Sequence, residues 1–249
     1  MWLSDLINSF FSNKNVTPSI QTNPVVTIQT SNTEIPITVE PIGLDLAKVS
    51  YKESPNKSER KDIVRGIVLH HTGPGGFDGI VAWLINPDAK AAAHYVIGTK
   101  GELTQLVNTQ KNAWHAGTSK FLLDGQVRDN LNHCTIGIEI CNAGVLHKGE
   151  DGKFYYEAGR DMREWKGQAP IEGSIVYPSG QTVTGYYPPY PKVQIDKVIE
   201  LCKALVLKYP QIGREDILTH YGIATPEGRK NDPFGLDIKD IVNKIFGGL

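Results

Sequence analysis

The stretch Thr135–Asn142, with the sequence TIGIEICN, alternates between large apolar residues and other types. Its three isoleucines share one face of an extended strand, whereas Gly137 and Glu139 lie on the opposite face. A carboxylate in the middle of a buried strand is costly unless it is paired or has a function, and the glycine beside it leaves room. The stretch therefore predicts a central strand of a sheet and makes Glu139 a candidate functional residue.

A second buried strand is predicted directly before a histidine pair. Residues 65–71 (RGIVLHH) are rich in apolar and β-branched side chains, and the glycine-rich turn TGPGG follows. Such a strand places its last side chains at a sheet edge, where loops build sites. Because successive side chains on a strand point to opposite faces, at most one of His70 and His71 can face a given cleft. The periodicity leaves open which one does.

A third stretch, residues 219–233 (THYGIATPEGRKNDP), combines three chemically active side chains. His220 closes a short apolar run, and a turn-rich loop then delivers Lys230 and Asp232 two positions apart. Imidazole and carboxylate are good zinc ligands, and an ammonium group can stabilise an oxyanion beside a metal. Loops of this composition are common, so a strand end followed by a solvated turn is the alternative interpretation.

The remaining pattern alternates helices and strands. Apolar spacing and turn signals predict helices over residues 77–86, 157–165, 193–209 and 237–246, and hairpins over 91–107 and around 178–180. The first hairpin carries His94, and the loop after it carries Trp114 and His115. For each of these two histidines a purely structural place is the alternative. The order of elements predicts an α/β fold, a central and mostly mixed sheet flanked by helices.

Length and composition exclude several classes of protein. The 249 residues suit one catalytic domain with an extension. The 26 basic and 27 acidic residues give a net charge of -1, which argues against a nucleic-acid partner held by bulk charge. The three cysteines are too few for a disulfide framework, and we expect buried thiols. No apolar run approaches the ~20 residues of a transmembrane segment.

The domain organisation is predicted from shifts in composition. Residues 1–41 read as an N-terminal amphipathic helix and a linker with one or two short edge strands, and the helix is expected to dock on its own domain, a partner or a membrane surface. The catalytic domain is expected over residues 42–249, with a loop insertion over about 144–191 that shapes or covers a site. No Lys or Arg precedes the first apolar residues, so a signal peptide is not indicated and we expect a cytoplasmic location until release.

Five ordered motifs together resemble the zinc-dependent N-acetylmuramoyl-L-alanine amidases of the type 2 amidase and peptidoglycan-recognition superfamily, in the branch of the bacterial muropeptide amidases. The motifs are VLHHT (68–72), AHYVI (93–97), AWHAG (113–117), IGIE (136–139) and RKNDP (229–233). The resemblance covers residues 60–240, but neither the first sixty residues nor the insertion.

The resemblance implies a cleft at one edge of the sheet that holds one Zn²⁺ per chain. It makes His70, His220 and Asp232 the metal ligands, Glu139 the catalytic glutamate and Lys230 the lysine that stabilises the transition state.

The motifs also contain residues that the resemblance places in the wall of the cleft. The resemblance offers His94, Trp114 and His115 as residues of the cleft wall that contact sugar or peptide. Relatives that use a catalytic tyrosine have it where this chain has Ala93, so the glutamate mechanism is favoured.

The implied substrate is peptidoglycan or a muropeptide, cleaved at the amide bond between the lactyl group of N-acetylmuramic acid and L-alanine. Two alternatives stay open: a non-catalytic peptidoglycan-recognition module, and a zinc peptidase that acts on the stem peptide. The lack of a signal-peptide pattern favours a phage-type lytic enzyme over a role in cell-wall recycling or competition.

Overall fold

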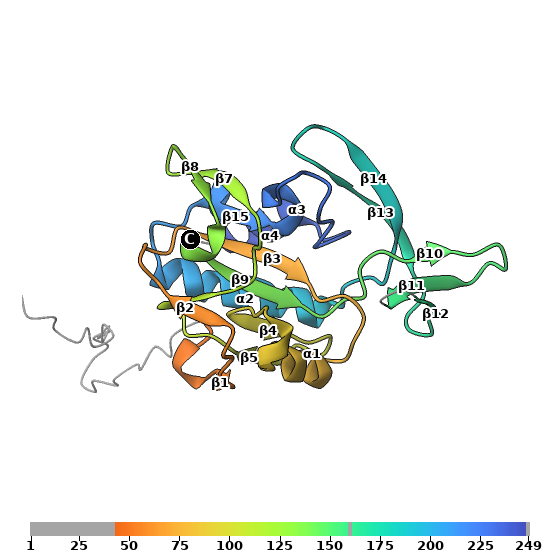
Figure 1. Cartoon of the computed structure of the whole chain (residues 1–249), viewed down its shortest axis with the longest axis horizontal. Coiled ribbons are helices and arrows are strands. Elements are labelled where there is room, and N and C mark those ends of the chain that lie inside the picture. Colours follow the sequence, from red (N-terminus) through yellow and green to blue (C-terminus); the bar gives the residue numbers. More distant parts are fainter. Residues whose placement is uncertain (1–42, 159–160, 248–249) are drawn as a thin grey trace, which may run out of the picture. The chain divides into compact units, whose positions relative to one another are not determined.

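A computed structural model describes residues 43–158 and 161–247 of the chain (Figure 1). The predicted N-terminal helix, the linker strands and the boundary at residue 42 lie outside these residues. The strands are β1 (Ser50–Tyr51), β2 (Lys57–Glu59), β3 (Gly66–His71), β4 (Tyr95–Ile97), β5 (Leu103–Gln105), β6 (Lys111–Ala113), β7 (Lys120–Leu123), β8 (Gln126–Asp129), β9 (Thr135–Ile140), β10 (His147–Lys148), β11 (Phe154–Ala158), β12 (Asp161–Glu164), β13 (Ile171–Val176), β14 (Thr182–Tyr187) and β15 (Ile217–Thr219). The α-helices are α1 (Phe77–Leu84), α2 (Lys192–Lys208), α3 (His220–Ile223) and α4 (Ile238–Phe246), and the 3-10 turns are η1 (Leu46–Lys48), η2 (Pro87–Ala89), η3 (Leu131–His133) and η4 (Arg214–Asp216).

The main sheet has six strands in the order β1-β5-β4-β9-β3-β15. β9 runs parallel to both of its neighbours, β3 and β4, whereas β4 and β5 are antiparallel, so the predicted mixed sheet with β9 at its centre is confirmed. The register between β3 and β9 sets His70 directly beside Glu139. Two residues that are 69 positions apart in the sequence thus become neighbours on one face of the sheet.

The two faces of the sheet have different coverings. The isoleucines of β9, together with Ile67 and Leu69 of β3, pack against α2 and α4 in the largest hydrophobic cluster. Each such side chain contributes roughly 1.5–3 kcal/mol when it is fully buried. Because side chains alternate along a strand, this burial turns His70, Gly137 and Glu139 to the opposite face. On that second face, α1 packs against Val96 of β4.

Most of the predicted elements are confirmed. The helices predicted over residues 77–86, 193–209 and 237–246 are α1, α2 and α4, and the two hairpins are β4–β5 and β13–β14. The three cysteines are buried and free, as expected.

The helix predicted over residues 157–165 is wrong, because β11 and β12 form an antiparallel hairpin there. Aromatic side chains favour strands where they find partners on neighbouring strands. Here the Phe154 ring meets Tyr186 at 5.1 Å and the Tyr156 ring meets Trp165 at 6.3 Å between centroids. These contacts outweigh the weak helical spacing of the segment.

The insertion lies beyond the carboxyl ends of β3 and β9, where it forms two small sheets, β10–β12 and β13–β14 (Figure 1). Ile175, Tyr177 and Tyr187 of the insertion pack against Phe234, two positions after Asp232. The insertion therefore supports the loop that carries a candidate ligand. Within residues 43–158 and 161–247, none of the helices has the length and hydropathy of a membrane span.

Candidate metal centre and active site

His70, His220 and Asp232 meet at the carboxyl ends of two neighbouring strands. β15 runs parallel to β3, with Thr219 beside Leu69. The residues that follow these two, His220 and His70, therefore lie at the same level of the sheet. The Nδ1 atoms of the two histidines are 3.0 Å apart, and Asp232 Oδ2 lies 3.1 Å from Nδ1 of His70 and 2.9 Å from Nδ1 of His220. All three residues are buried.

The electrostatics of this cluster suit a bound cation. Burial, followed by repulsion from His220, lowers the pKa of His70 to about 4, so its ring is neutral near pH 7. Two imidazoles and one carboxylate are a common donor set for a divalent metal. Ligands at about 2.0–2.1 Å from a tetrahedral ion lie about 3.3 Å from one another, close to the spacing here. The residues present therefore fit a metal ion.

Glu139 lies beside this cluster with an unsatisfied carboxylate. The residue as a whole is partly accessible, but its Oε2 atom is buried and has no hydrogen-bond partner among the described residues. Burial, with a smaller contribution from the negative charge of Asp232, raises the pKa of Glu139 to about 8. A nearby cation favours the ionised form of a carboxyl group. An occupied metal site would therefore lower this pKa towards the range in which Glu139 can accept a proton at neutral pH.

One cavity of about 290 Å³ joins these groups. Its lining includes the metal-binding cluster, Glu139, Lys230 and the exposed indoles of Trp83 and Trp114. A larger cavity of about 530 Å³ lies beside the insertion and contains none of the candidate site residues. We identify the smaller cavity as the site, because it alone of the two contains the clustered titratable groups.

The two adjacent histidines have different surroundings. His70 belongs to the cluster, whereas Nδ1 of His71 accepts a hydrogen bond from the backbone N–H of Phe234 at 3.0 Å. The His71 ring also occupies the space beside Gly144, where an added Cβ would come within 2.3 Å of its Nε2. His71 thus joins the end of β3 to the loop after Asp232, and its ring is not one of the clustered donors.

The other motif residues separate into two groups. Trp114 and His115 line the cavity, whereas His94 does not. His94 is fully buried: its Nδ1 accepts from the backbone N–H of Gly137, and its Nε2 donates to the carbonyl of Lys111. Both nitrogens of His94 are used inside the protein, so the geometry gives its ring nothing to offer a substrate.

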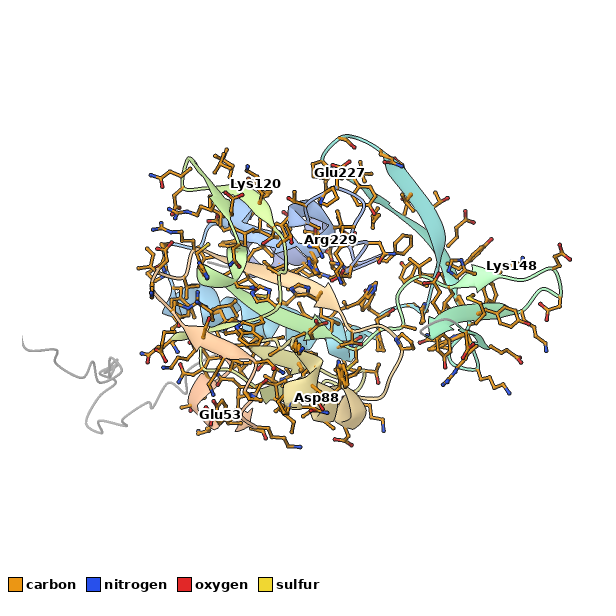
Figure 2. The ribbon with its side chains drawn as sticks, viewed as in Figure 1. Glu53, Asp88, Lys120, Lys148, Glu227 and Arg229 are labelled. Carbon is orange, nitrogen blue, oxygen red and sulfur yellow. The ribbon has the colours of Figure 1, made fainter. Side chains whose placement is uncertain are left out.

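Three residues around the site were given no role from the sequence, although Thr135 and Arg229 lie within the quoted motifs. Asn132 accepts two backbone hydrogen bonds from the loop that carries His115, and Thr135 contacts the His115 ring. Arg229 donates to the carbonyls of Ala116 and Thr118, which ties the loop before Asp232 to the same segment (Figure 2). Of these residues, only Thr135 could have been found from the sequence, because it shares a strand face with Glu139.

The raised pKa of Glu139 predicts a pH dependence of stability in the metal-free protein. The folded pKa of about 8 lies above the reference value of 4.5, so the folded state binds a proton more tightly. The contribution of Glu139 to the stability of the metal-free protein should therefore fall as pH rises from about 4.5 to 8, by a few kcal/mol at about 1.36 kcal/mol per pKa unit. Glu139→Gln cannot titrate and should escape this loss.

Thermal unfolding with chelator present at pH 5 and pH 9 measures the effect. The Tm of Glu139→Gln should exceed that of the parent by more at pH 9 than at pH 5. Glu172→Gln, at an exposed position of β13, is the matched control and should track the parent at both pH values. An equal Tm difference at the two pH values for Glu139→Gln would contradict a raised pKa.

The sequence of the chain is similar to the sequences of known proteins. Residues 59–235 match the sequence pattern of the N-acetylmuramoyl-L-alanine amidases. The chain is 29% identical over 177 residues to N-acetylmuramoyl-L-alanine amidase AmiD of Escherichia coli, an alignment that covers 68% of this chain and 49% of AmiD. The chain spans between about a third and half of the length of the curated relatives that it matches first.

Two solved structures share the fold. A crystal structure of an AmpD derivative superposes with a TM-score of 0.51 at 22% identity, covering 80% of this chain and 95% of the other. AMPDH3 from Pseudomonas aeruginosa, in complex with anhydromuramic pentapeptide, superposes with a TM-score of 0.50 at 26% identity, covering 82% of this chain and 66% of the other. The mixed sheet flanked by helices is thus shared with these proteins.

Proposed function

Since this chain belongs to the type 2 family of N-acetylmuramoyl-L-alanine amidases, we propose that it hydrolyses the amide bond between the lactyl group of N-acetylmuramic acid and L-alanine in peptidoglycan or muropeptides. The observation that carries the proposal is the joint presence of His70, His220, Asp232, Glu139 and Lys230 around one cavity. The relative AMPDH3, whose structure holds an anhydromuramic pentapeptide, supports the same class of substrate.

His70, His220 and Asp232 would hold one zinc ion in this proposal. The chemistry of the donor set and the spacing of 2.9–3.1 Å between its atoms support a small divalent ion. When bound, zinc supplies a Lewis acid that polarises the scissile carbonyl and lowers the pKa of a water to about 7.

Glu139 would act as the general base and then as the general acid. Glu139 lines the cavity, and its buried Oε2 atom has no hydrogen-bond partner among the described residues. The carboxylate would take a proton from the attacking water and return it to the leaving nitrogen of L-alanine, which makes the amine a better leaving group.

Lys230 would stabilise the negative charge that develops on the carbonyl oxygen. Its side chain lines the same cavity as Glu139, and an ammonium group lowers the energy of an oxyanion most where water is excluded. Trp114 and His115 also line the cavity and are the proposed wall of the substrate site.

Mass analysis of products from purified sacculi tests the function. An amidase frees the amino terminus of L-alanine and leaves intact glycan strands, and zinc chelation should stop this release. Exposure of other amines would instead indicate a peptidase acting on the stem peptide, and binding without any released product would indicate a recognition module. Either of the last two results would end the amidase proposal.

The catalytic unit is proposed to be residues 42–249, because every candidate site residue follows position 69. A shortened chain that begins at residue 42 should release the same product from soluble muropeptides at about the full-length rate. A folded but inactive shortened chain would place the boundary elsewhere.

A further inference from the structure

The loop Trp114–Gly117 contacts both histidines of the proposed metal centre. The His115 ring lies against the edge of the His70 ring, and the carbonyl of Ala116 lies against Nε2 of His220. A neutral histidine carries its proton on one ring nitrogen, and the hydrogen bond at the other nitrogen determines which one is free to bind a metal. The protons in this loop can be assigned from the hydrogen bonds alone.

The assignment begins at the hydroxyl of Thr135. That hydroxyl lies 2.6 Å from the carbonyl oxygen of Leu131, which can only accept, so the hydroxyl proton is donated there. The Thr135 Oγ1 atom lies 3.2 Å from Nε2 of His115 and must accept a proton from it. The proton of His115 is therefore on Nε2, and its Nδ1 carries a lone pair.

The assignment continues to the first proposed ligand. Nδ1 of His115 lies 3.0 Å from Nε2 of His70, so His70 must be the donor in this contact. The proton of His70 is therefore on Nε2, and its Nδ1 presents a lone pair to the cluster with Asp232. A chain of three hydrogen bonds thus runs from the Leu131 carbonyl to Nε2 of His70, and the other nitrogen of that ring, Nδ1, faces the metal site.

The second proposed ligand is oriented by the backbone of the same loop. Nε2 of His220 lies 3.1 Å from the carbonyl oxygen of Ala116, which only accepts, so His220 also carries its proton on Nε2. Its Nδ1 is left as a lone pair beside Nδ1 of His70. With the carboxylate of Asp232, three acceptor atoms face one another at about 3 Å, an arrangement that a cation stabilises.

Two further contacts hold this loop in place. Oδ1 of Asn132 accepts from the backbone N–H groups of both His115 and Ala116, at 2.9 and 2.7 Å. The His115 ring lies on Gly137, where an added Cβ would come within 2.4 Å of its Cγ atom. The absence of a side chain at Gly137 makes room for the ring.

We propose that the loop Trp114–Gly117 is the orienting layer of the metal centre, in which His115, held by Thr135, sets the tautomer of His70 and the Ala116 carbonyl sets that of His220. His115 is thus a positioning residue that acts through His70. The inference rests on the metal site of the proposed function but not on the reaction. Partners of this kind typically change metal affinity by 10- to 100-fold when they are removed.

The first test reads the protons directly. Nitrogen-15 correlation spectra of the zinc-loaded protein at neutral pH should show His70, His115 and His220 all protonated on Nε2. A proton on Nδ1 of either His70 or His115 in the parent protein would overturn the proposal, and this readout needs no variant to fold.

The second test measures metal affinity by competition with a chromogenic zinc chelator. Thr135→Val keeps the shape but removes the hydroxyl, and should weaken zinc binding about tenfold, whereas Thr135→Ser keeps the hydroxyl and should bind like the parent. His115→Phe should weaken zinc binding by about 10- to 100-fold, and His133→Phe, at an exposed histidine of the adjacent η3 turn, should not.

Equal zinc affinity of folded Thr135→Val and Thr135→Ser proteins would overturn the proposal. If Thr135→Ser also lost zinc binding, side-chain packing at this position rather than the hydroxyl would determine the zinc affinity. That result would also overturn the proposal. A parent protein that binds zinc but releases no L-alanine terminus would contradict the proposed function and leave the orienting role supported.

Discussion

A chain that carries Glu139→Gln should remain folded and bind about one zinc ion, while its turnover falls by about 10²- to 10⁴-fold, the usual contribution of a positioned general base. Glutamine is nearly isosteric with glutamate and fills the same place on β9, but it cannot accept a proton from water. Since Glu139 is not one of the three clustered donors, its replacement leaves the metal-binding set intact.

Zinc stoichiometry and turnover have to be measured on the same purified protein. Glu172→Gln is the control for a neutralised glutamate on an exposed strand, and it should retain the parent rate. A zinc-loaded, folded Glu139→Gln protein with nearly the parent turnover would show that Glu139 is not the base. The search would then move to His115 and to residues of the insertion.

Asp232→Ala should lose both metal and activity. This change removes the only carboxylate of the cluster and leaves the two histidines, so zinc affinity should fall by more than the roughly 100-fold that is seen when an outer hydrogen-bond partner is lost. Turnover at limiting zinc should fall in parallel. Chelation of the parent protein should give the same inactive state, and added zinc should reverse it.

The comparison of Asp232→Ala with Glu139→Gln separates the roles of the two carboxylates. The first should lose zinc, and the second should keep zinc but lose turnover. Asp88→Ala, at an exposed aspartate of η2, is the control for removal of an acidic side chain and should change neither property (Figure 2). An Asp232→Ala protein that keeps one tightly bound zinc ion would remove Asp232 from the ligand set.

Several features of the protein could be predicted from the sequence because they depend on local periodicity. The alternation of residues 135–140 predicted a central strand with its isoleucines on one side, and burial of these side chains against α2 and α4 is the reason. The same parity put Glu139 on the other face. The motifs named His70, His220, Asp232 and Lys230, which the structure brings together around one cavity.

Other features depend on contacts between segments far apart in the chain. Alternation alone could not choose between His70 and His71. The choice depends on β15, which sets His220 beside His70, and on Phe234, whose backbone N–H binds His71. The strands β11 and β12 replaced a predicted helix because they pair with each other and because the Phe154 ring of β11 contacts Tyr186 of β14.

The hydrogen bonds of the orienting layer were the least accessible to sequence reasoning. The contact between His70 and His115 spans 45 positions and that between His220 and Ala116 spans 104, so no short motif records them. The sequence by itself determined the strands and the candidate donors, since both follow from local pattern and side-chain chemistry. Only the tertiary structure decided which ring nitrogen each histidine presents, because a proton takes its position from the acceptor that folding brings beside it.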